Sequence, residues 1–170
     1  RAARTAYALR PDDPLAEMQL AFALLFDRQL QEGYKHNEVR FKYKLKSYLQ
    51  FPYPKWQGEP DKTVYLSADQ GLGDTLSYAR FIPAMCARAK YVHALIQPEF
   101  LRLFNNAFVG KCPNLNLIPQ PAPFPPADAW STFVSIPNAL GLSDEEIRNT
   151  PDIELPRFFV PRNWRVPDRK

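Results

Sequence analysis

Glycine, cysteine and histidine are all scarce in this chain of 170 residues, which has six glycines, two cysteines and two histidines. Cys86 and Cys112 are too few for a disulfide framework, and His36 and His93 lie far from any metal-ligand spacing. We therefore expect no structural metal site and a reducing, cytoplasmic compartment. The longest apolar runs are far below the roughly 18 residues that a membrane span needs, so we also expect no membrane span.

The chain also lacks an initiating methionine and a basic-then-apolar leader, and we expect it to be a piece of a longer protein, truncated at both ends. Lysine and arginine number 22 against 18 aspartates and glutamates, which leaves a formal net charge of +4. This small excess is spread along most of the chain. Such a balance does not indicate a nucleic-acid partner.

Two helical patterns occupy the first 50 residues. Residues 14–26 space their apolar side chains mostly three or four apart, after a Pro-Asp-Asp-Pro sequence that supplies a cap and a helix-start proline. A second, looser stripe runs over residues 30–48, so we expect an antiparallel helical pair. The segment 51–61 is rich in proline and aromatic residues, which predicts an ordered connector that Trp56 pins to a neighbouring domain.

From Lys62 onward the apolar pattern changes from the helical to the strand type. Four short runs rich in β-branched and apolar residues predict strands at 63–68, 91–97, 115–118 and 130–136. Helical patterns follow the first, second and fourth of them, at 74–90, from Pro98 and at 138–142, and Pro83 predicts a kink in the first. Alternating strands and helices are typical of a parallel sheet, so we predict an α/β fold with a Rossmann-like half-domain over residues 62–170.

The sequence DQGLGDTL at 69–76 lies where open α/β sheets place their ligand sites, between the first predicted strand and the first predicted helix. A dinucleotide fingerprint needs a small residue where this chain has Leu76, and a phosphate loop needs a lysine where it has Asp74. An aspartate at a helix N-terminus would also repel a phosphate. A nucleotide-binding Rossmann protein is therefore disfavoured.

The first 50 residues resemble part of a tetratricopeptide-repeat array. Residues 6–12 resemble the end of one repeat, and the next repeat would place its small and apolar packing residues at Leu20, Ala21, Leu24 and Gly33. Arg28 and Arg40 depart from the glycine and the alanine that such a repeat usually has. Because such repeats need neighbours to bury their faces, the resemblance implies that further repeats precede this one.

The glycine loop, together with residues 54–59, 78–83 and 134–141, resembles bacterial proteins in which tetratricopeptide repeats precede a family 9, heptosyltransferase-like glycosyltransferase domain. The resemblance implies a helical hairpin at 1–50, a connector at 51–61 and, at 62–170, the N-terminal half of a two-domain glycosyltransferase fold. It implies that the nucleotide-sugar donor binds mainly a C-terminal half, so we expect no cofactor and no activity in this fragment alone.

The same resemblance implies the site residues. Asp74 corresponds to the base that removes the proton of the acceptor hydroxyl, which is a poor nucleophile until that proton leaves. The residues expected to bind the acceptor are Gln70, Gly71, Gly73, Thr75 and Arg80.

Each of these roles has a structural alternative. Aspartate is among the best N-cap residues, so Asp74 could instead satisfy free amides at a helix start. Arg80 could form a surface ion pair or stack on an aromatic ring. For function, the leading hypothesis is the acceptor-side half of an inverting glycosyltransferase, in which the repeats recruit a protein or glycan acceptor. The competing hypothesis is a non-catalytic interaction or scaffold module in a larger assembly.

Overall fold

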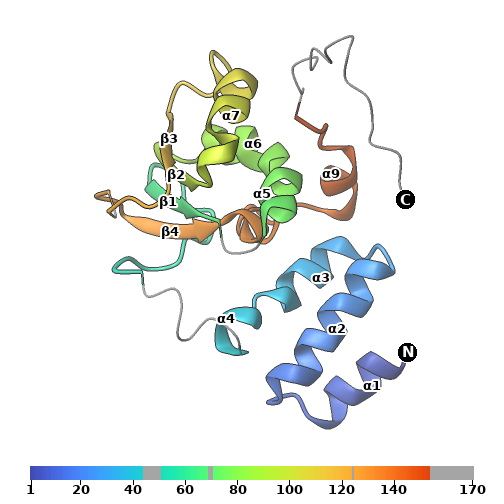
Figure 1. Cartoon of the computed structure of the whole chain (residues 1–170). Helices are drawn as coiled ribbons and strands as arrows, with labels where there is room; N and C mark the ends of the chain where they lie inside the picture. Colours follow the sequence, from blue (N-terminus) through green and yellow to red (C-terminus); the bar gives the residue numbers. More distant parts are fainter. Residues whose placement is uncertain (44–50, 69–70, 124, 154–170) are drawn as a thin grey trace, which may run out of the picture.

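The computed structural model describes residues 1–43, 51–68, 71–123 and 125–153. Within these ranges a helical region comes first and a parallel β-sheet with its helices follows, so the chain has an α/β fold (Figure 1). No helix among the described residues is both long and apolar enough to cross a membrane. The helices of the first region are α1 (Ala2–Leu9), α2 (Pro14–Phe26), α3 (Leu30–Asn37) and α4 (Arg40–Tyr43).

The second region contains four strands, β1 (Thr63–Ser67), β2 (Tyr91–Ile96), β3 (Leu115–Pro119) and β4 (Ala129–Thr132). Its helical segments are α5 (Leu72–Tyr78), η1 (Ala79–Phe81), α6 (Ile82–Arg88), η2 (Pro98–Phe100), α7 (Leu101–Phe108), η3 (Phe133–Ser135), α8 (Ile136–Ala139) and α9 (Asp144–Asn149). The helical region lies to one side of the sheet, where α3 contacts α8 and α9 (Figure 1).

Helices α2 and α3 run side by side in opposite directions, as the two helical patterns predict (Figure 1). Helix α2 begins as expected, because Asp13 caps it by accepting a hydrogen bond from the Leu15 amide at 2.9 Å. The two helices approach closely at Gly33, where an added Cβ would lie 2.8 Å from the Leu25 side chain. The small residue is therefore required by the packing of α2 against α3.

The second helix is shorter than the pattern predicts, and residues 44–48 of the predicted helix lie outside the described residues. Helix α3 ends at Asn37, and a turn separates it from α4. This turn brings Glu38 and Arg40 together toward the end of β4, where both side chains find polar partners. The local helical pattern is thus interrupted by contacts with a distant part of the chain.

The four strands are parallel and lie in the order β3-β2-β1-β4. On the central strand β1, Val64 pairs with Val92 of β2 on one side and with Ala129 of β4 on the other. Val64 and Leu66 are fully buried, as expected for a parallel strand that is covered on both faces. The sheet therefore confirms the prediction of an α/β fold with a parallel sheet.

Strand β4 ends earlier than predicted. The sequence pattern predicts a strand through residue 136, whereas residues 133–136 form η3 and the first residue of α8. Pro137 lies in the first turn of α8, a position where proline favours a helix start. Pro83 has the same place in α6, so the predicted kink takes the form of a division into α5, η1 and α6.

The connector extends the sheet beyond β4. The Trp130 amide donates to the Pro54 carbonyl at 2.9 Å, and the Trp56 amide donates to the Trp130 carbonyl at 2.7 Å. Trp56 is fully buried, and its indole N–H donates to the Glu59 carbonyl at 2.9 Å. Trp56 therefore anchors the connector, as its aromatic character predicts.

Gly58, just after this anchor, has a φ of 87°, and a Cβ added to it would lie 2.2 Å from the Ala139 carbonyl oxygen. We expect Gly58→Ala to lower the free energy of unfolding more than Gly110→Ala. Gly110 has a similar φ of 77° but no atom within 4 Å of an added Cβ. The shared cost of positive φ is about 1–2 kcal/mol, and the clash at Gly58 adds about 1–3 kcal/mol. Urea unfolding of both variants measures the difference, and equal losses would contradict this packing.

Candidate functional site

The glycine loop follows the carboxyl end of β1, as the sequence predicts. Its first two residues, Asp69 and Gln70, lie outside the described residues, so the predicted role of Gln70 stays a prediction. Helix α5 begins at Leu72, and Gly71 is its N-cap, with an extended backbone and no side-chain cap. Asp74 is the third residue of the helix. The suggestion that Asp74 is the N-cap is therefore wrong, because the helix starts two residues earlier than the sequence pattern indicates.

An open cavity of about 390 Å³ lies beside this helix. Its lining comes from α3, from the helical run that starts with α5 and from the segment after α9: Tyr34, Asp74, Ser77, Tyr78, Arg80, Phe81 and Asp152. Asp74 is exposed, and the backbone near it is open, because a Cβ added to Gly73 would meet nothing within 4 Å. A ligand in this cavity can thus reach the Asp74 carboxylate.

Thr75 differs from its neighbours because it is buried. Its hydroxyl accepts a hydrogen bond from Gln97 Nε2 at 3.1 Å and donates to the Gly71 carbonyl at 3.4 Å. Gln97 directly follows β2, so Thr75 links the start of α5 to the carboxyl end of the neighbouring strand. In this arrangement the Thr75 hydroxyl positions the loop, and both of its contacts lie within the protein.

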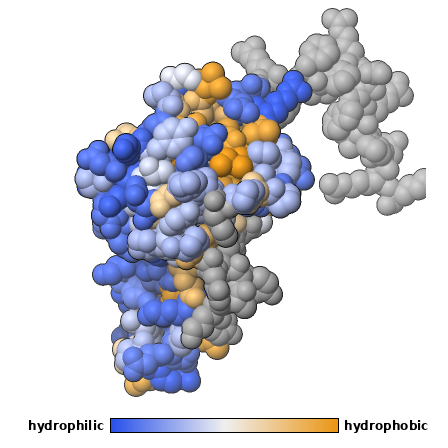
Figure 2. Space-filling model, turned by 90° about the vertical axis from the view of Figure 1, so that its left-hand side faces the viewer, coloured by the Kyte–Doolittle hydropathy of each residue, from blue (hydrophilic) through white to orange (hydrophobic). Residues whose placement is uncertain are grey.

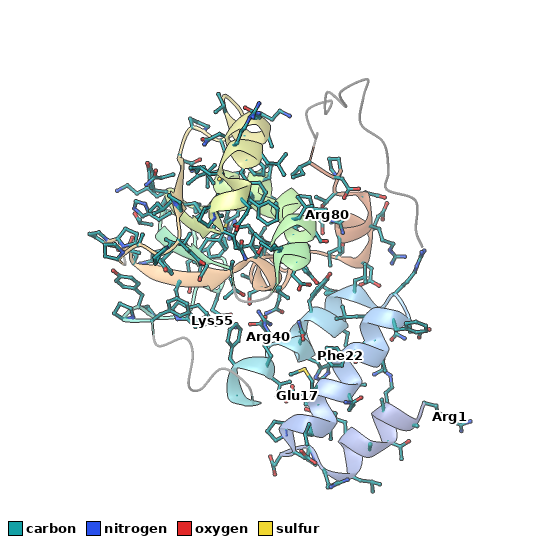
Figure 3. The ribbon with its side chains drawn as sticks, viewed as in Figure 1. Arg1, Glu17, Phe22, Arg40, Lys55 and Arg80 are labelled. Atoms are coloured by element: carbon teal, nitrogen blue, oxygen red, sulfur yellow. The ribbon has the colours of Figure 1, made fainter. Side chains whose placement is uncertain are left out.

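Arg80 lies between α5 and the segment that contains α9 (Figure 3). Its Nη1 is 3.5 Å from the Thr150 carbonyl oxygen and 3.5 Å from Asp152 Oδ1. The guanidinium also lies over the Phe81 ring, 4.8 Å from the ring centre. Both structural alternatives for Arg80, an ion pair and an aromatic stack, are therefore present, and Arg80 also lines the cavity of Asp74.

The helical region contributes Tyr34 to the cavity wall. Its ring meets the Tyr78 ring edge-on, with 5.8 Å between the ring centres. Burial raises the pKa of Tyr78, and the neighbouring Tyr34 and Asp74 raise it further. The Tyr78 phenol therefore stays protonated at neutral pH, and its hydroxyl is hydrogen-bonded to the Tyr34 side chain.

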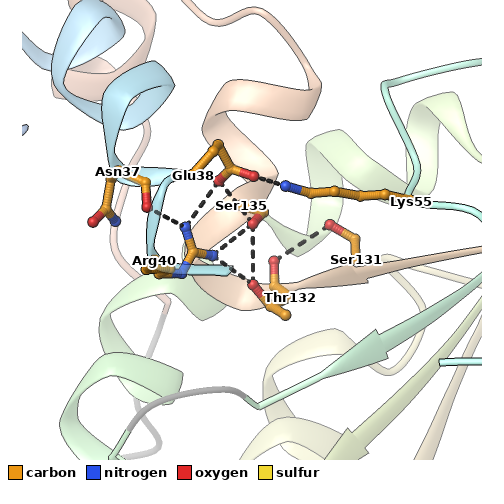
Figure 4. Close-up of polar contacts among 7 residues, drawn as sticks. All are labelled: Asn37, Glu38, Arg40, Lys55, Ser131, Thr132 and Ser135. Carbon is orange, nitrogen blue, oxygen red and sulfur yellow. Dashed lines mark hydrogen bonds and ion pairs between the residues drawn. The ribbon is translucent and has the colours of Figure 1, made fainter. Parts of the chain in front are cut away.

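A second polar group, the Arg40 cluster, joins the helical region to the sheet; its members are Glu38, Arg40, Lys55, Thr132 and Ser135 (Figure 4). Arg40 is buried, and its Nη2 donates to Thr132 Oγ1 at 2.9 Å and to Ser135 Oγ at 2.6 Å. Its Nη1 donates to Glu38 Oε1 at 2.9 Å, and the other Glu38 oxygen pairs with Lys55. These contacts hold α3 and α4 against the carboxyl end of β4.

In the sequence, Arg40 stands out only as a departure from the alanine of a repeat. An arginine at a position that packs against a neighbouring element nevertheless indicates buried polar partners, because a buried charge is costly without them. Those partners, Thr132 and Ser135, lie 92 and 95 residues away, so the sequence pattern could not identify them.

Among the residues that the structure describes, no group of three or more histidines, cysteines or carboxylates could hold a metal ion. No protein-family model matches this chain, and neither a curated protein nor a solved structure matches it.

The Arg40 cluster predicts a large effect for Glu38→Gln, which removes the carboxylate between the cations Arg40 and Lys55. We expect it to lower the free energy of unfolding by about 3–5 kcal/mol, because the buried Arg40 guanidinium loses a carboxylate that neutralises its charge. The control is Glu32→Gln, which breaks the Arg4–Glu32 pair, whose side chains are 50% and 41% exposed. Such exposed pairs contribute little. Chemical denaturation compares the two variants, and losses of similar size would contradict a buried cluster.

Proposed function

We propose that this chain is the acceptor-side half of an inverting glycosyltransferase that uses a nucleotide-sugar donor. The proposal rests on the exposure and the position of the Asp74 carboxylate. Its carboxylate is exposed, caps no helix and lines an open cavity beside α5, the helix that follows the carboxyl end of β1. Open α/β sheets bind their ligands at this edge.

The chemistry of sugar transfer suits such a carboxylate. The acceptor hydroxyl must lose its proton as the new bond forms, and a positioned base is worth about 100- to 10,000-fold in rate. Asp74 would accept that proton, while the open backbone at Gly73 lets the acceptor approach. The cavity of about 390 Å³ falls within the range that small-molecule sites occupy.

The proposal includes a Rossmann-like half-domain and a tetratricopeptide-type hairpin. The strand order β3-β2-β1-β4 matches the first four strands of a doubly wound Rossmann sheet, which supports an N-terminal Rossmann-like half-domain. The donor would bind mainly a further domain of a longer protein. The pairing of α2 with α3 and the close approach at Gly33 support a tetratricopeptide-type hairpin. In the proposal this hairpin contributes Tyr34 to the cavity and recruits a protein or glycan acceptor.

A non-catalytic interaction module is the second candidate. It is favoured by apolar side chains that the helical region exposes, since Leu9, Phe22 and Phe26 are 77%, 52% and 93% exposed. On the face shown in Figure 2, by contrast, the helical region is largely hydrophilic and hydrophobic residues gather on the sheet-containing part. The two candidates differ in whether Asp74 takes part in a reaction.

In the longer protein that carries the donor half, we expect Asp74→Asn to reduce sugar transfer by at least about 100-fold, because asparagine cannot accept the proton. Its thermal unfolding midpoint should stay near that of the wild type, since Asp74 is exposed and caps no helix. Release of nucleoside diphosphate from a panel of nucleotide-sugars measures the rate.

The matched control is Asp12→Asn, which makes the same chemical change at an exposed position between α1 and α2. It should retain full activity. If Asp74→Asn kept most of its activity, the catalytic role of Asp74 would be excluded. If the wild type transferred no sugar from any donor, the interaction module would replace the enzyme as the better account.

A further inference from the structure

Arg80 stands between two cavities. The first is the polar cavity of Asp74, and the second, of about 440 Å³, is lined mainly by apolar side chains of α6 and α7, such as Pro83, Ala84 and Phe108. Arg80 and Asp152 line both cavities. The Arg80–Asp152 pair therefore separates a polar cavity from an apolar one.

The bonds that hold Arg80 in place are weak for a guanidinium. Its two polar contacts with the described residues are both 3.5 Å long, whereas charge-assisted hydrogen bonds measure about 2.7–2.9 Å. Its Nε is buried and has no hydrogen-bond partner among the described residues. The Asp152 side chain is 90% exposed, so little of the protein fixes it beside Arg80. Arg40, by comparison, donates hydrogen bonds of 2.6 to 3.1 Å to Asn37, Glu38, Thr132 and Ser135.

A guanidinium with unused N–H donors presents a planar fork that fits a carboxylate or a phosphate with two parallel hydrogen bonds. The neighbouring Asp74 carboxylate disfavours one side of the fork, because Asp74 lines the first cavity and not the second. An anion that binds Arg80 from the second cavity thus lies away from the Asp74 carboxylate.

We infer that Arg80 is the binding site for an anionic group of the ligand, a carboxylate or a phosphate, and that Asp152 occupies this site when no ligand is bound. The ligand anion replaces the Asp152 carboxylate on the guanidinium, and its hydroxyl end then extends toward Asp74. Asp152 is therefore an intramolecular competitor that the ligand must displace. The inference rests on the proposed function and adds that the acceptor is acidic. Anion binding can nevertheless be measured without any sugar transfer.

The test uses the ¹⁵N-labelled chain and two probes, inorganic phosphate and acetate, titrated separately while the Arg80 Nε–H signal is followed by NMR. We expect phosphate to shift this signal. Asp152→Asn should tighten the apparent dissociation constant by about two- to five-fold, the effect expected when an exposed ion pair no longer competes. Asp12→Asn changes the net charge equally and should leave the constant unchanged. An equal response to acetate would identify a carboxylate as sufficient, and a response to phosphate alone would identify a phosphate-bearing ligand.

Two further variants test the role of Arg80 directly. Arg80→Lys retains the positive charge but loses the planar fork, so it should weaken phosphate binding, as followed by the amide signals around the cavity. Asp74→Asn should bind phosphate at least as well as the wild type, which separates this inference from the catalytic proposal. If neither probe shifts the Arg80 signal, the anion site is excluded. If Asp152→Asn and Asp12→Asn give the same constant, Asp152 is not a competitor.

Discussion

The buried guanidinium of Arg40 is the interaction on which the arrangement of the two regions depends. A buried charge is costly unless partners surround it, and here the partners come from separate parts of the chain. Glu38 precedes α4, whereas Thr132 and Ser135 lie at the carboxyl end of β4 (Figure 4). Because hydrogen bonds are directional, these contacts set the position of α3 relative to the sheet. They thereby place Tyr34 against Tyr78, and the cavity of Asp74 gains a wall from the helical region.

The parallel sheet supplies the other constraint on the site. All four strands point the same way, so the loops that follow β1, β2 and β4 gather at one edge. Gln97 after β2 holds Thr75 at the start of α5, and Arg40 holds the end of β4. The connector covers the outer side of β4 through the bonds of Trp56 and Pro54 to Trp130. The contacts of Gln97, Arg40 and the connector thus stabilise the edge of the sheet that carries the candidate site, while Asp74 itself stays open to solvent.

Local patterns in the sequence predicted the elements whose causes are local. Asp13 and Pro14 predict the start of α2, and the β-branched runs predict β1 and β2. Pro83 predicts a break in the helix after β1. The errors arose where distant contacts decide the structure. The break after Asn37 and the early end of β4 both allow members of the Arg40 cluster to contact one another. These residues are far apart in sequence.

In the candidate site, too, only the features with local causes were predicted from the sequence. The glycines placed the loop correctly, but they could not show that the helix starts at Leu72 or that Thr75 is buried. Nor could they show that Asp152 reaches Arg80, because that pair joins residues some seventy positions apart. The tetratricopeptide and glycosyltransferase assignments, and the domain limits at 1–50, 51–61 and 62–170, stay predictions.

The central claim is that the helical region and the sheet form one structural unit, with the cavity of Asp74 between them. Native-state hydrogen exchange of the wild-type chain tests it most directly, because it measures the free energy of opening for each amide. The account predicts that the most protected amides of α3 and those of β1 open with the same free energy, since the Arg40 cluster couples them. If the α3 amides exchanged through a much less costly opening while β1 stayed protected, the helical region would open independently and the claim would be contradicted.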